Sequence, residues 1–519
     1  MSDSQEAQVP DVLAMYAGLN PDKPVVIHED RVMTWSELNE KSKTLARALY
    51  GLGLRPGDKA SLMTYNLPEY FEVREALTRL GVGMVPVGYR MVGPEIEYIV
   101  DNSDSKMLFF FHEFADRIIP RRDNYEKLLP DGLVSIAGPA EGAVDMEKLY
   151  GSPADVDLDT LDSSQGDSMI YTSGTTGKPK GAMRRGNVMA NESVRTLLTD
   201  LISFLKYGPD EVHLVACPLY HSAPIVFSMI AYYLGGTMVL MPKYDPLEFL
   251  KNIDRHKVTS VNTVPTILNT LLEVPEETVK ELDLSSLRTM IVGAAPTFPQ
   301  TKLAILDRFG PVLYEYYGST ELGVNTFINP EEMRERPGSV GRGFSINDIK
   351  LLDDDGKEVP KGEPGEFFTH HGMLIDGYYK DDEATQESLH GKYMTVGDMA
   401  MQDEDGYYFI VDRKNDMIIR AGVNIYPAEV ETVLSRMPGV ADIAVVGVPD
   451  EHWGEIVAAF VVLEKGSKVT EEDIKEFGRG EMTHYMIPEI IEFLDELPRT
   501  PTGKVLKKNL RAEMKLKRV

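Results

Sequence analysis

Short apolar runs alternate with helical patterns along the chain up to about Gly318. One helix is predicted where Thr34 and Glu37 have the spacing of a capping box and leucines then recur at near-helical intervals. Gly51 and Pro56 are expected to stop this helix. The same alternation continues through "SVNTVPTILNTLLEV" and "LRTMIVGAAP". It predicts an α/β fold built on parallel sheets.

The pattern changes across residues 338–411, where acidic turns separate short strand-like runs. These turns are "DDDG" at residues 353–356 and "DEDG" at residues 403–406. They predict an antiparallel β part. Aspartate clusters also occur in calcium sites, but "DDDGKEVPKGE" lacks the alternating ligand spacing of a calcium loop. We therefore interpret both clusters as turns.

After about Asn415 a compact tail of roughly 100 residues follows, a normal size for a domain. Its pattern is helix ("YPAEVETVLSRM"), strand ("ADIAVVGV"), strand ("IVAAFVVL"), helix ("TEEDIKEF") and strand ("EIIEFLDEL"). We predict a small α+β domain at residues 416–519, after a large domain of several subdomains at residues 1–415.

The run "PIVFSMIAYYLGGTMVLM" reaches the length of a short membrane span. Gly235 and Gly236 interrupt it, and the following "TMVLM" has the character of a buried strand. We interpret the run as a core helix, a turn and a strand. The start, "MSDSQEAQVP", has neither a basic region nor an apolar core, so no secretory signal is predicted.

Composition narrows the class of protein. Of the 519 residues, 43% are hydrophobic, which is enough for sizeable cores. Asp and Glu total 82 against 54 Lys and Arg, so the net charge is −28. This field repels nucleic acid and anionic lipid, and any anionic ligand must be met by local positive charge. Cys217 is the single cysteine, which excludes an internal disulfide and fits a cytoplasmic location.

The stretch "YTSGTTGKPKG", residues 171–181, carries the first candidate chemistry. Its glycines expose backbone N–H groups beside hydroxyl donors, and two lysines add charge, a combination that suits phosphate oxygens. It is not a Walker A loop, because only two residues separate Gly174 from Gly177 and Pro179 would disturb a following helix. By itself the stretch is equally compatible with a surface loop.

Further motifs occur in a fixed order along most of the chain: "PLYHSAP", "GAAP", "YYGSTE", "TVGDMAMQDEDGYYFIVDRKND", "AGVNIYPAEVE" and "PRTPTGKVLKKNLR". Together with the glycine-rich stretch they closely resemble the adenylate-forming superfamily of acyl-CoA synthetases, peptide-synthetase adenylation domains and beetle luciferases. The similarity is greatest to fatty-acid–CoA ligases. The resemblance implies activation of a carboxylic acid by ATP and Mg²⁺ to acyl-AMP, followed by capture on a thiol such as CoA.

The resemblance also implies roles for individual residues. The catalytic candidates are Lys504, Thr320, Glu321 and His221, with Glu321 as the magnesium ligand. The nucleotide-binding and cofactor-binding candidates are Thr172, Ser173, Gly174, Thr175, Thr176, Gly177, Lys178, Lys180, Gly293, Ala294, Ala295, Tyr316, Tyr317, Gly318, Ser319, Asp398, Arg413 and Gly422.

Each nucleotide role has a chemical reason and a plainer alternative. Tyr317 offers a flat face for adenine, although an aromatic residue before glycine can equally belong to the core. Asp398 and Arg413 can bind ribose or phosphate, although an Asp after Gly is often only a turn residue. Thr320 is expected at the α-phosphate. Glu321 supplies the oxygen that Mg²⁺ prefers, although "STE" can also cap a helix.

The remaining candidates have alternatives of the same kind. Lys504 would bridge the carboxylate and the phosphate, whereas most of the basic residues after it are expected to form a solvated helix face. His221 is either a gate of the acyl pocket or a satisfied packing residue. Cys217 has no base partner visible in the sequence and is interpreted as a buried structural thiol.

Three positions depart from the family pattern. Asn415 stands at the hinge position, where relatives commonly have Asp or Lys. Ala421 replaces the first glycine of a Gly-Gly pair, which narrows the expected path of a pantetheine arm. Val396 replaces a threonine in the ribose motif. None of these changes removes a group that adenylation needs.

The segments expected to line the acid pocket are "LYHSAPIVF", "GAAPT" and "YYGSTELGVNTF", which contain no Arg or Lys. A second carboxylate would be costly to bury there, so an apolar monocarboxylic acid is expected. Small residues at Gly293, Ala294 and Ala295 suit a deep slot. A medium or longer aliphatic acid is predicted, with an aryl acid as the runner-up.

Three other functions stay open at this point: loading of a separate carrier protein, a nucleotide sensor without catalysis, and luciferase-like light emission. The sensor is disfavoured because Glu321, Asp398, Arg413 and Lys504 are all present. The expected partners are the acid, ATP and CoA, with no nucleic acid and no integral membrane segment. A homodimer is left open.

Overall fold

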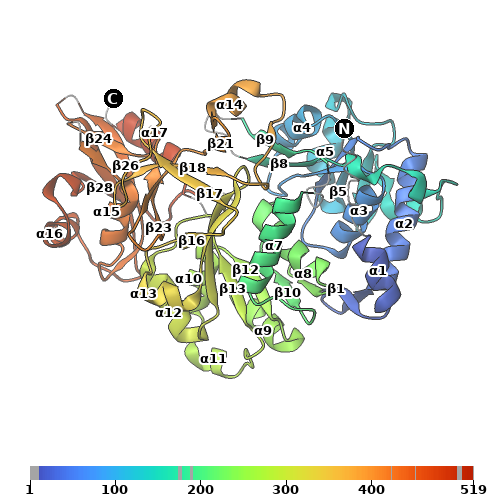
Figure 1. Cartoon of the computed structure of the whole chain (residues 1–519), viewed down its shortest axis with the longest axis horizontal. Coiled ribbons are helices and arrows are strands. Elements are labelled where there is room, and N and C mark those ends of the chain that lie inside the picture. Colours follow the sequence, from blue (N-terminus) through green and yellow to red (C-terminus); the bar gives the residue numbers. More distant parts are fainter. Residues whose placement is uncertain are drawn as a thin grey trace.

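The molecule is elongated, and its sequence runs from one end to the other. The computed structural model describes residues 11–172, 178–186, 191–421, 423–450, 452–499 and 505–517, with side chains up to Met514. In Figure 1 the first helices of the chain lie at one end and the last elements at the other, with the large central sheet between them.

The central sheet has nine strands, and its six middle strands run parallel. Its order is β16 (Arg342–Gly343), β15 (Gly323–Ile328), β14 (Leu313–Ser319), β13 (Thr289–Val292), β12 (Ser260–Thr263), β10 (Val212–Val215), β11 (Thr237–Leu240), β1 (Pro24–His28) and β2 (Arg31–Thr34). The edge strands β16 and β2, and β15 next to β16, pair antiparallel with their neighbours.

Helices cover both faces of this sheet, which explains why its inner strands, such as β12 and β13, are buried along their whole length. In β13, Met290 and Val292 pack with α9 (Pro246–His256), α10 (Pro265–Glu273) and α12 (Pro299–Phe309). Ile291, between them, packs on the other face with α7 (Glu192–Phe204) and α8 (Ser222–Tyr233). The run with membrane-like length is therefore α8, a turn and β11, as predicted. Two further helices are α11 (Glu276–Lys280) and α13 (Pro330–Glu335).

A second parallel sheet lies nearer the N-terminus. Its order is β4 (Gly83–Pro86), β3 (Lys59–Met63), β5 (Ser105–Phe111), β6 (Leu133–Ile136) and β7 (Val144–Asp145). The helices of this region are α1 (Val12–Leu19), α2 (Trp35–Gly51), α3 (Pro68–Arg79), α4 (Gly93–Asn102), α5 (Ala115–Ile118) and α6 (Met146–Leu149). Thr34 and Glu37 form the predicted capping box of α2, and the helix ends at Gly51.

The predicted antiparallel part is also present. One sheet contains β17 (Asp348–Leu352), β18 (Gly365–His370), β20 (Leu389–His390), β21 (Tyr393–Met394), β22 (Asp398–Gln402) and β23 (Tyr408–Arg413). Another contains β19 (Gly377–Tyr378), β9 (Lys180–Arg184) and β8 (Ser168–Thr172), with α14 (Asp382–Glu387) nearby. Asp353 and Asp403 accept hydrogen bonds from the backbone of their own turns, at 2.8 Å from Lys357 N and from Tyr407 N. The two acidic clusters are thus turns.

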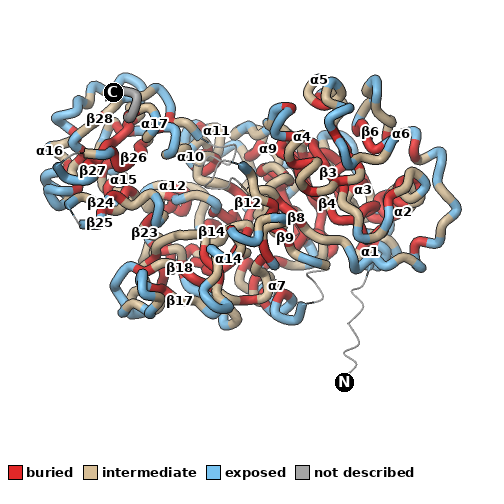
Figure 2. Tube along the Cα trace, turned by 90° about the horizontal axis from the view of Figure 1, so that it is seen from above, coloured by how far each residue is buried: buried red, intermediate tan, exposed pale blue. Residues whose placement is uncertain are grey.

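The last sheet is formed by β25 (Val423–Ile425), β24 (Ile418–Arg420), β27 (Gly454–Leu463), β26 (Val440–Asp450) and β28 (Ile490–Phe493). The helices α15 (Pro427–Leu434), α16 (Glu471–Glu481) and α17 (Lys507–Lys517) complete this region. Neighbouring residues of β26 belong to separate apolar clusters, Val445 to one and Val446 to the other. We call the part of the chain from β24 to α17 the small region. Figure 2 shows buried residues inside it as well as inside the rest of the molecule.

Candidate active site

A cavity of about 2240 Å³ opens where the parallel strands of the central sheet end. Residues just after β10, β12 and β13 line it, and so do Tyr316 to Thr320 at the end of β14 and the turn beyond it. Ligands of open α/β sheets bind in this position, outside the carboxyl ends of the strands. The small region contributes wall residues from α15 and from the start of α17. The motifs that the sequence singled out are thereby brought to one place.

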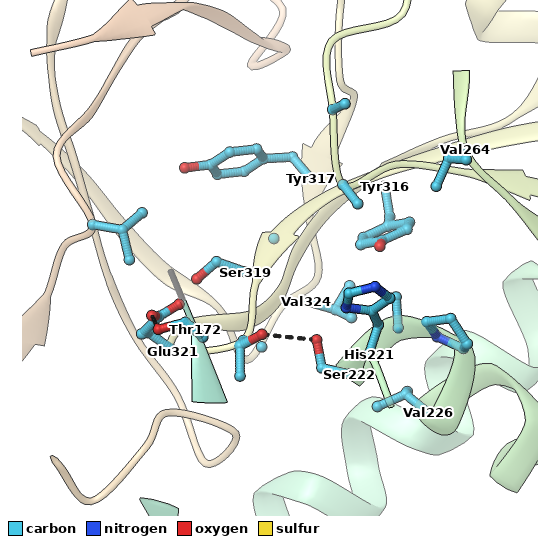
Figure 3. A pocket seen from close by; sticks show the side chains of 18 of the residues that line it. Thr172, His221, Ser222, Val226, Val264, Tyr316, Tyr317, Ser319, Glu321 and Val324 are labelled. Carbon is cyan, nitrogen blue, oxygen red and sulfur yellow. Dashed lines mark hydrogen bonds between the residues drawn. The ribbon is translucent and has the colours of Figure 1, made fainter. Parts of the chain in front are cut away.

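The turn at Thr320 and Glu321 is held from four directions. Thr172 Oγ1 donates to Glu321 Oε1 at 2.8 Å, and the Tyr378 hydroxyl donates to the same oxygen at 3.3 Å. The hydroxyls of Ser222 and Thr320 lie 3.0 Å apart (Figure 3). Arg184 Nη2 donates to the Thr320 carbonyl at 2.6 Å. Because β14 leads through this turn into β15, "STE" caps no helix, and that alternative is wrong.

Glu321 fits the kind of magnesium site that keeps several water and phosphate ligands. Its side chain lies in the cavity wall, and the residue is 8% exposed. Among the described residues, no cluster of three or more His, Cys, Asp or Glu side chains offers a complete metal cage. A single carboxylate suits Mg²⁺, which is usually bound through one or two carboxylates together with substrate phosphates.

A second polar cluster joins Tyr317, Asp398 and Arg413. The Tyr317 hydroxyl donates to Asp398 Oδ2 at 2.8 Å, and Arg413 Nε lies 3.3 Å from Asp398 Oδ1. Asp398 and Arg413 are partners in the pairing of β22 with β23. Burial, together with the nearby Asp398 charge, raises the pKa of the Tyr317 phenol, so it remains a neutral donor. The cluster offers carboxylate, phenol and guanidinium groups on one wall.

His221 stands immediately before α8 and faces the ring of Tyr316, while Tyr317 projects to a different side of β14 (Figure 3). Burial and the nearby Arg90 lower the pKa of His221 to about 4, so the ring is neutral at physiological pH. Its Nε2 atom is buried and has no hydrogen-bond partner among the described residues. The ring therefore packs beside Tyr316 and keeps one buried nitrogen without a hydrogen-bond partner in the described part of the chain.

Gly293 makes room for the ring of Tyr316 rather than for a substrate. A Cβ atom added at Gly293 would lie 2.3 Å from the Tyr316 ring. Gly293 is not part of the cavity wall, and the expectation that it widens a slot is wrong because the tyrosine fills that space. Ala294 and Ala295 do line the cavity, and Ala294 has the left-handed backbone angle φ 67°.

Of the predicted phosphate stretch, the structure describes residues 171–172 and 178–181. Lys180 lines the cavity and pairs with Asp381 at 3.3 Å. Lys178 lies over the Tyr98 ring, 5.4 Å from its centroid, and is not part of the cavity wall. Seven predicted residues lie outside the described residues: Ser173, Gly174, Thr175, Thr176, Gly177, Gly422 and Lys504.

Two residues at the site, Arg184 and Tyr378, were not predicted from the sequence. Arg184 Nε donates to the Met373 carbonyl at 2.8 Å, and burial lowers the pKa of Arg184 to about 10. Both residues reach Glu321 or Thr320 from strands β9 and β19, far away in the sequence. The sequence signal for Arg184 was the short run "GAMRRGN", whose first arginine follows buried strand residues. Arg184 also adds a basic group to a wall whose predicted segments contain none.

Lys507 differs from the sequence-based expectation, whereas Cys217 agrees with it. Lys507 is not a fully solvated residue of a basic helix face, because its side chain is only 15% exposed and its ammonium group lies 2.9 Å from Glu431 Oε1. Cys217 is buried, and burial raises the pKa of its thiol to about 12. The interpretation of Cys217 as a structural thiol is confirmed.

Comparisons with known proteins agree with this geometry. The family model "AMP-binding enzyme" matches residues 13–379, and the model "AMP-binding enzyme C-terminal domain" matches residues 429–504. A feruloyl-CoA synthase of Amycolatopsis is 35% identical over 95% of this chain and 96% of its own length. The long-chain-fatty-acid–CoA ligase FadD13 of Mycobacterium tuberculosis is 32% identical over 93% of each chain.

A solved structure extends the similarity to the fold. The o-succinylbenzoate CoA synthetase MenE of Bacillus subtilis, in complex with its acyl-adenylate intermediate, has a TM-score of 0.84 and 27% identity, with 97% of this chain and 98% of that chain covered. In the described part of the present chain, no helix combines the length and the apolar character needed to cross a bilayer.

Proposed function

The chain belongs to the AMP-binding enzyme family, and we propose that it is an acid–CoA ligase specific for an apolar monocarboxylic acid. In this proposal the acid attacks the α-phosphate of ATP, which releases pyrophosphate and forms acyl-AMP. The thiol of CoA then attacks the acyl carbonyl and releases AMP. The observation that carries the proposal is the meeting of the Glu321 turn and the Tyr317–Asp398–Arg413 cluster in one cavity.

The proposed roles follow from the groups present. The Asp398 carboxylate can accept from ribose hydroxyls, and Arg413 can donate to ribose or phosphate. The Thr320 hydroxyl is proposed to donate to the α-phosphate, with Ser222 setting its rotamer. Mg²⁺ held by Glu321 would neutralise phosphate charge. His221, neutral and lacking a partner at Nε2, is proposed to lie against the acyl group or the reacting carboxylate.

Apolar side chains of α7 and α8 in the cavity wall support the choice of acid, among them Leu198, Ile202, Val226 and Ile230. Cavity residues extend along α8 from Ser222 to Tyr233, and a helix of its 12 residues is about 18 Å long. A medium or long aliphatic acid could lie extended beside such a helix. An aryl acid would occupy only its inner part and remains the second candidate.

Pyrophosphate release over a panel of acids tests this function. The panel should contain short, medium and long aliphatic acids, ferulate, indoleacetate and a dicarboxylate, each with and without CoA. We expect the largest release with medium or long aliphatic acids and CoA. Preference for the dicarboxylate would contradict the apolar pocket. Product formation with a phosphopantetheinylated carrier protein but not with CoA would replace the proposed acceptor.

The two-domain division is also part of the proposal. Residues 1–415 are proposed to bind the nucleotide and the acid, and residues 416–519 to turn as a unit between the two half-reactions. Relatives are thought to turn about a residue near Arg413, which corresponds here to Asn415. Both half-reactions would then use the same carbonyl carbon in the same cavity.

A further inference from the structure

Helix α15, the first helix after the proposed pivot, lacks a cap of its own. Tyr426 occupies its N-cap position and makes no side-chain hydrogen bond to the helix. Instead, Asp412 Oδ2 accepts from Ala428 N at 2.9 Å. Asp412 lies in β23, before Asn415, whereas α15 lies after it. The helix is therefore capped by a carboxylate from the other side of the pivot, where a negative charge is favourable.

A largely covered cluster of charges surrounds this cap. Asp412 is only 9% exposed, and its other oxygen accepts from Arg413 N at 2.7 Å. Lys507 of α17 interacts electrostatically with Asp412 and forms its ion pair with Glu431 of α15. Glu431 also accepts from Val445 N at 2.7 Å. Among the described residues, the acidic groups that act on Lys507 are Glu431, Asp412 and Asp416, and Asp416 also pairs with Arg511.

Two further contacts across the pivot are of a different kind. Gln300 Nε2 donates to Ser435 Oγ at 2.8 Å in an exposed position, and Phe298 is a partly buried residue at the edge of the small core. An exposed hydrogen bond exchanges easily with water. A buried carboxylate that loses its donor and its ammonium neighbour pays a desolvation cost. The Asp412 cluster therefore favours this orientation of the small region more strongly than the exposed contact does.

We propose that Asp412 is a positioning residue for acyl-adenylate formation. It holds α15, and with it the small domain, in the orientation described here. Rotation about Asn415 for thioester formation must break the Asp412–Ala428 hydrogen bond. This inference rests on the two half-reactions of the proposed function. Asp412 touches no substrate in it and acts only through the domain that it orients.

A cross-linking experiment tests the orientation without relying on activity. Gln300 and Ser435, which touch across the pivot, are both replaced by cysteine, and the native Cys217 is buried. A short bis-maleimide should cross-link this double variant rapidly. Adding Asp412→Ala should slow cross-linking about tenfold, because a buried hydrogen bond to a charged group is lost. Lys508→Met, at an exposed position of α17, is the matched control and should change nothing.

The half-reactions provide the second readout. Asp412→Ala should lower ATP–pyrophosphate exchange about tenfold while thioester formation from supplied acyl-AMP stays unchanged or rises. Asp412→Asn, which keeps an acceptor oxygen, should recover part of the exchange. Unchanged cross-linking, or equal losses in both half-reactions at an unaltered melting temperature, would overturn the inference. If the parent enzyme shows no acid-dependent exchange, the proposed function fails, and cross-linking alone still decides the role of Asp412.

Discussion

At the scale of single residues, the role of several positions depends on a partner residue that is distant in the sequence. Gly293 has no Cβ because the Tyr316 ring lies there. Glu321 is a candidate magnesium ligand whose carboxylate is oriented by Thr172 and Tyr378. Hydrogen-bonded neighbours of this kind fix a ligand and tune its affinity.

Glu321→Ala should raise the magnesium concentration needed for half-maximal adenylation by about tenfold or more, because the proposed ligand is lost. Titration of Mg²⁺ in a pyrophosphate-release assay measures this change. Tyr378→Phe is the matched control, since it removes the 3.3 Å hydrogen bond and leaves the carboxylate. A magnesium requirement unchanged in Glu321→Ala would show that the ion is bound elsewhere.

His213 provides a residue-scale prediction about acid stability. It is 1% exposed, its Nδ1 lies 2.8 Å from Ser260 Oγ, and burial lowers the pKa of His213 to about 3. The unfolded chain binds a proton near pH 6.5 that the folded chain does not, so this contribution is complete above pH 6.5 and is lost as the pH falls. Between pH 6.5 and pH 5, proton uptake by His213 in the unfolded chain should lower the free energy of unfolding by about 2 kcal/mol.

Melting temperatures at pH 7 and pH 5 test this expectation. His213→Gln should show a smaller decline on acidification than the parent protein. His452→Gln, at an exposed position, should decline like the parent. Identical declines in all three proteins would mean that His213 is protonated without unfolding.

At the scale of elements, the turn between β23 and β24 decides how the two parts of the chain are joined. Lys414 N donates to Gly397 O at 2.8 Å, and Asp416 N and Met417 N donate to Arg413 O. The Asn415 amide takes part in none of these bonds, and Asn415 is not among the residues with positive φ. A proline at position 415 would therefore remove no hydrogen bond of this turn, although it would restrict the backbone of Lys414 before it.

Asn415→Pro should retain ATP–pyrophosphate exchange and lose most thioester synthesis. The ring fixes φ near −65° and biases Lys414 towards extended conformations, which opposes a large rotation at this point. Both half-reactions and the melting temperature should be measured, with Asn415→Ala as the flexible control. A well-folded Asn415→Pro enzyme that makes thioester at the parental rate would place the pivot elsewhere, with Asp416 as the next candidate.

At the scale of the whole molecule, a chain of net charge −28 must still accept ATP. The cavity wall meets this requirement with local positive charge from both the phosphate stretch and the antiparallel sheet, including Lys180, Arg184 and Arg413. In the C-terminal part of the chain, Arg499 and Val505 form an antiparallel β-bridge, and both residues line the cavity. The site thus draws on both parts of the molecule.

Lys504→Ala should lower adenylation by about two to three orders of magnitude, the usual effect of one well-placed electrostatic group. Thioester formation from supplied acyl-AMP should fall much less, because the small domain is expected to carry Lys504 away for that step. Parallel assays of the two half-reactions measure the difference. Equal losses in both would contradict a two-orientation enzyme.

Much of the fold could be predicted from local patterns. The capping box at Thr34 specified the start of α2, and the acidic turn at Asp403 specified the β22–β23 hairpin, because these signals involve residues only a few positions apart. The ordered motifs likewise identified the family, since each is a short, local stretch. "STE" was ambiguous because a helix cap and a strand turn use the same residue types.

The tertiary structure decided what depends on distant partners. Arg184 reaches the Thr320 carbonyl across 136 positions of sequence, and the largely covered Lys507 ammonium pairs with Glu431. Burial and the pKa of a group depend on every element that surrounds it, and no local spacing contains that information. By itself the sequence determined the family, the order of the elements and the chemistry available. Only the folded chain determined which side chains meet, because folding sets the distances between residues far apart in sequence.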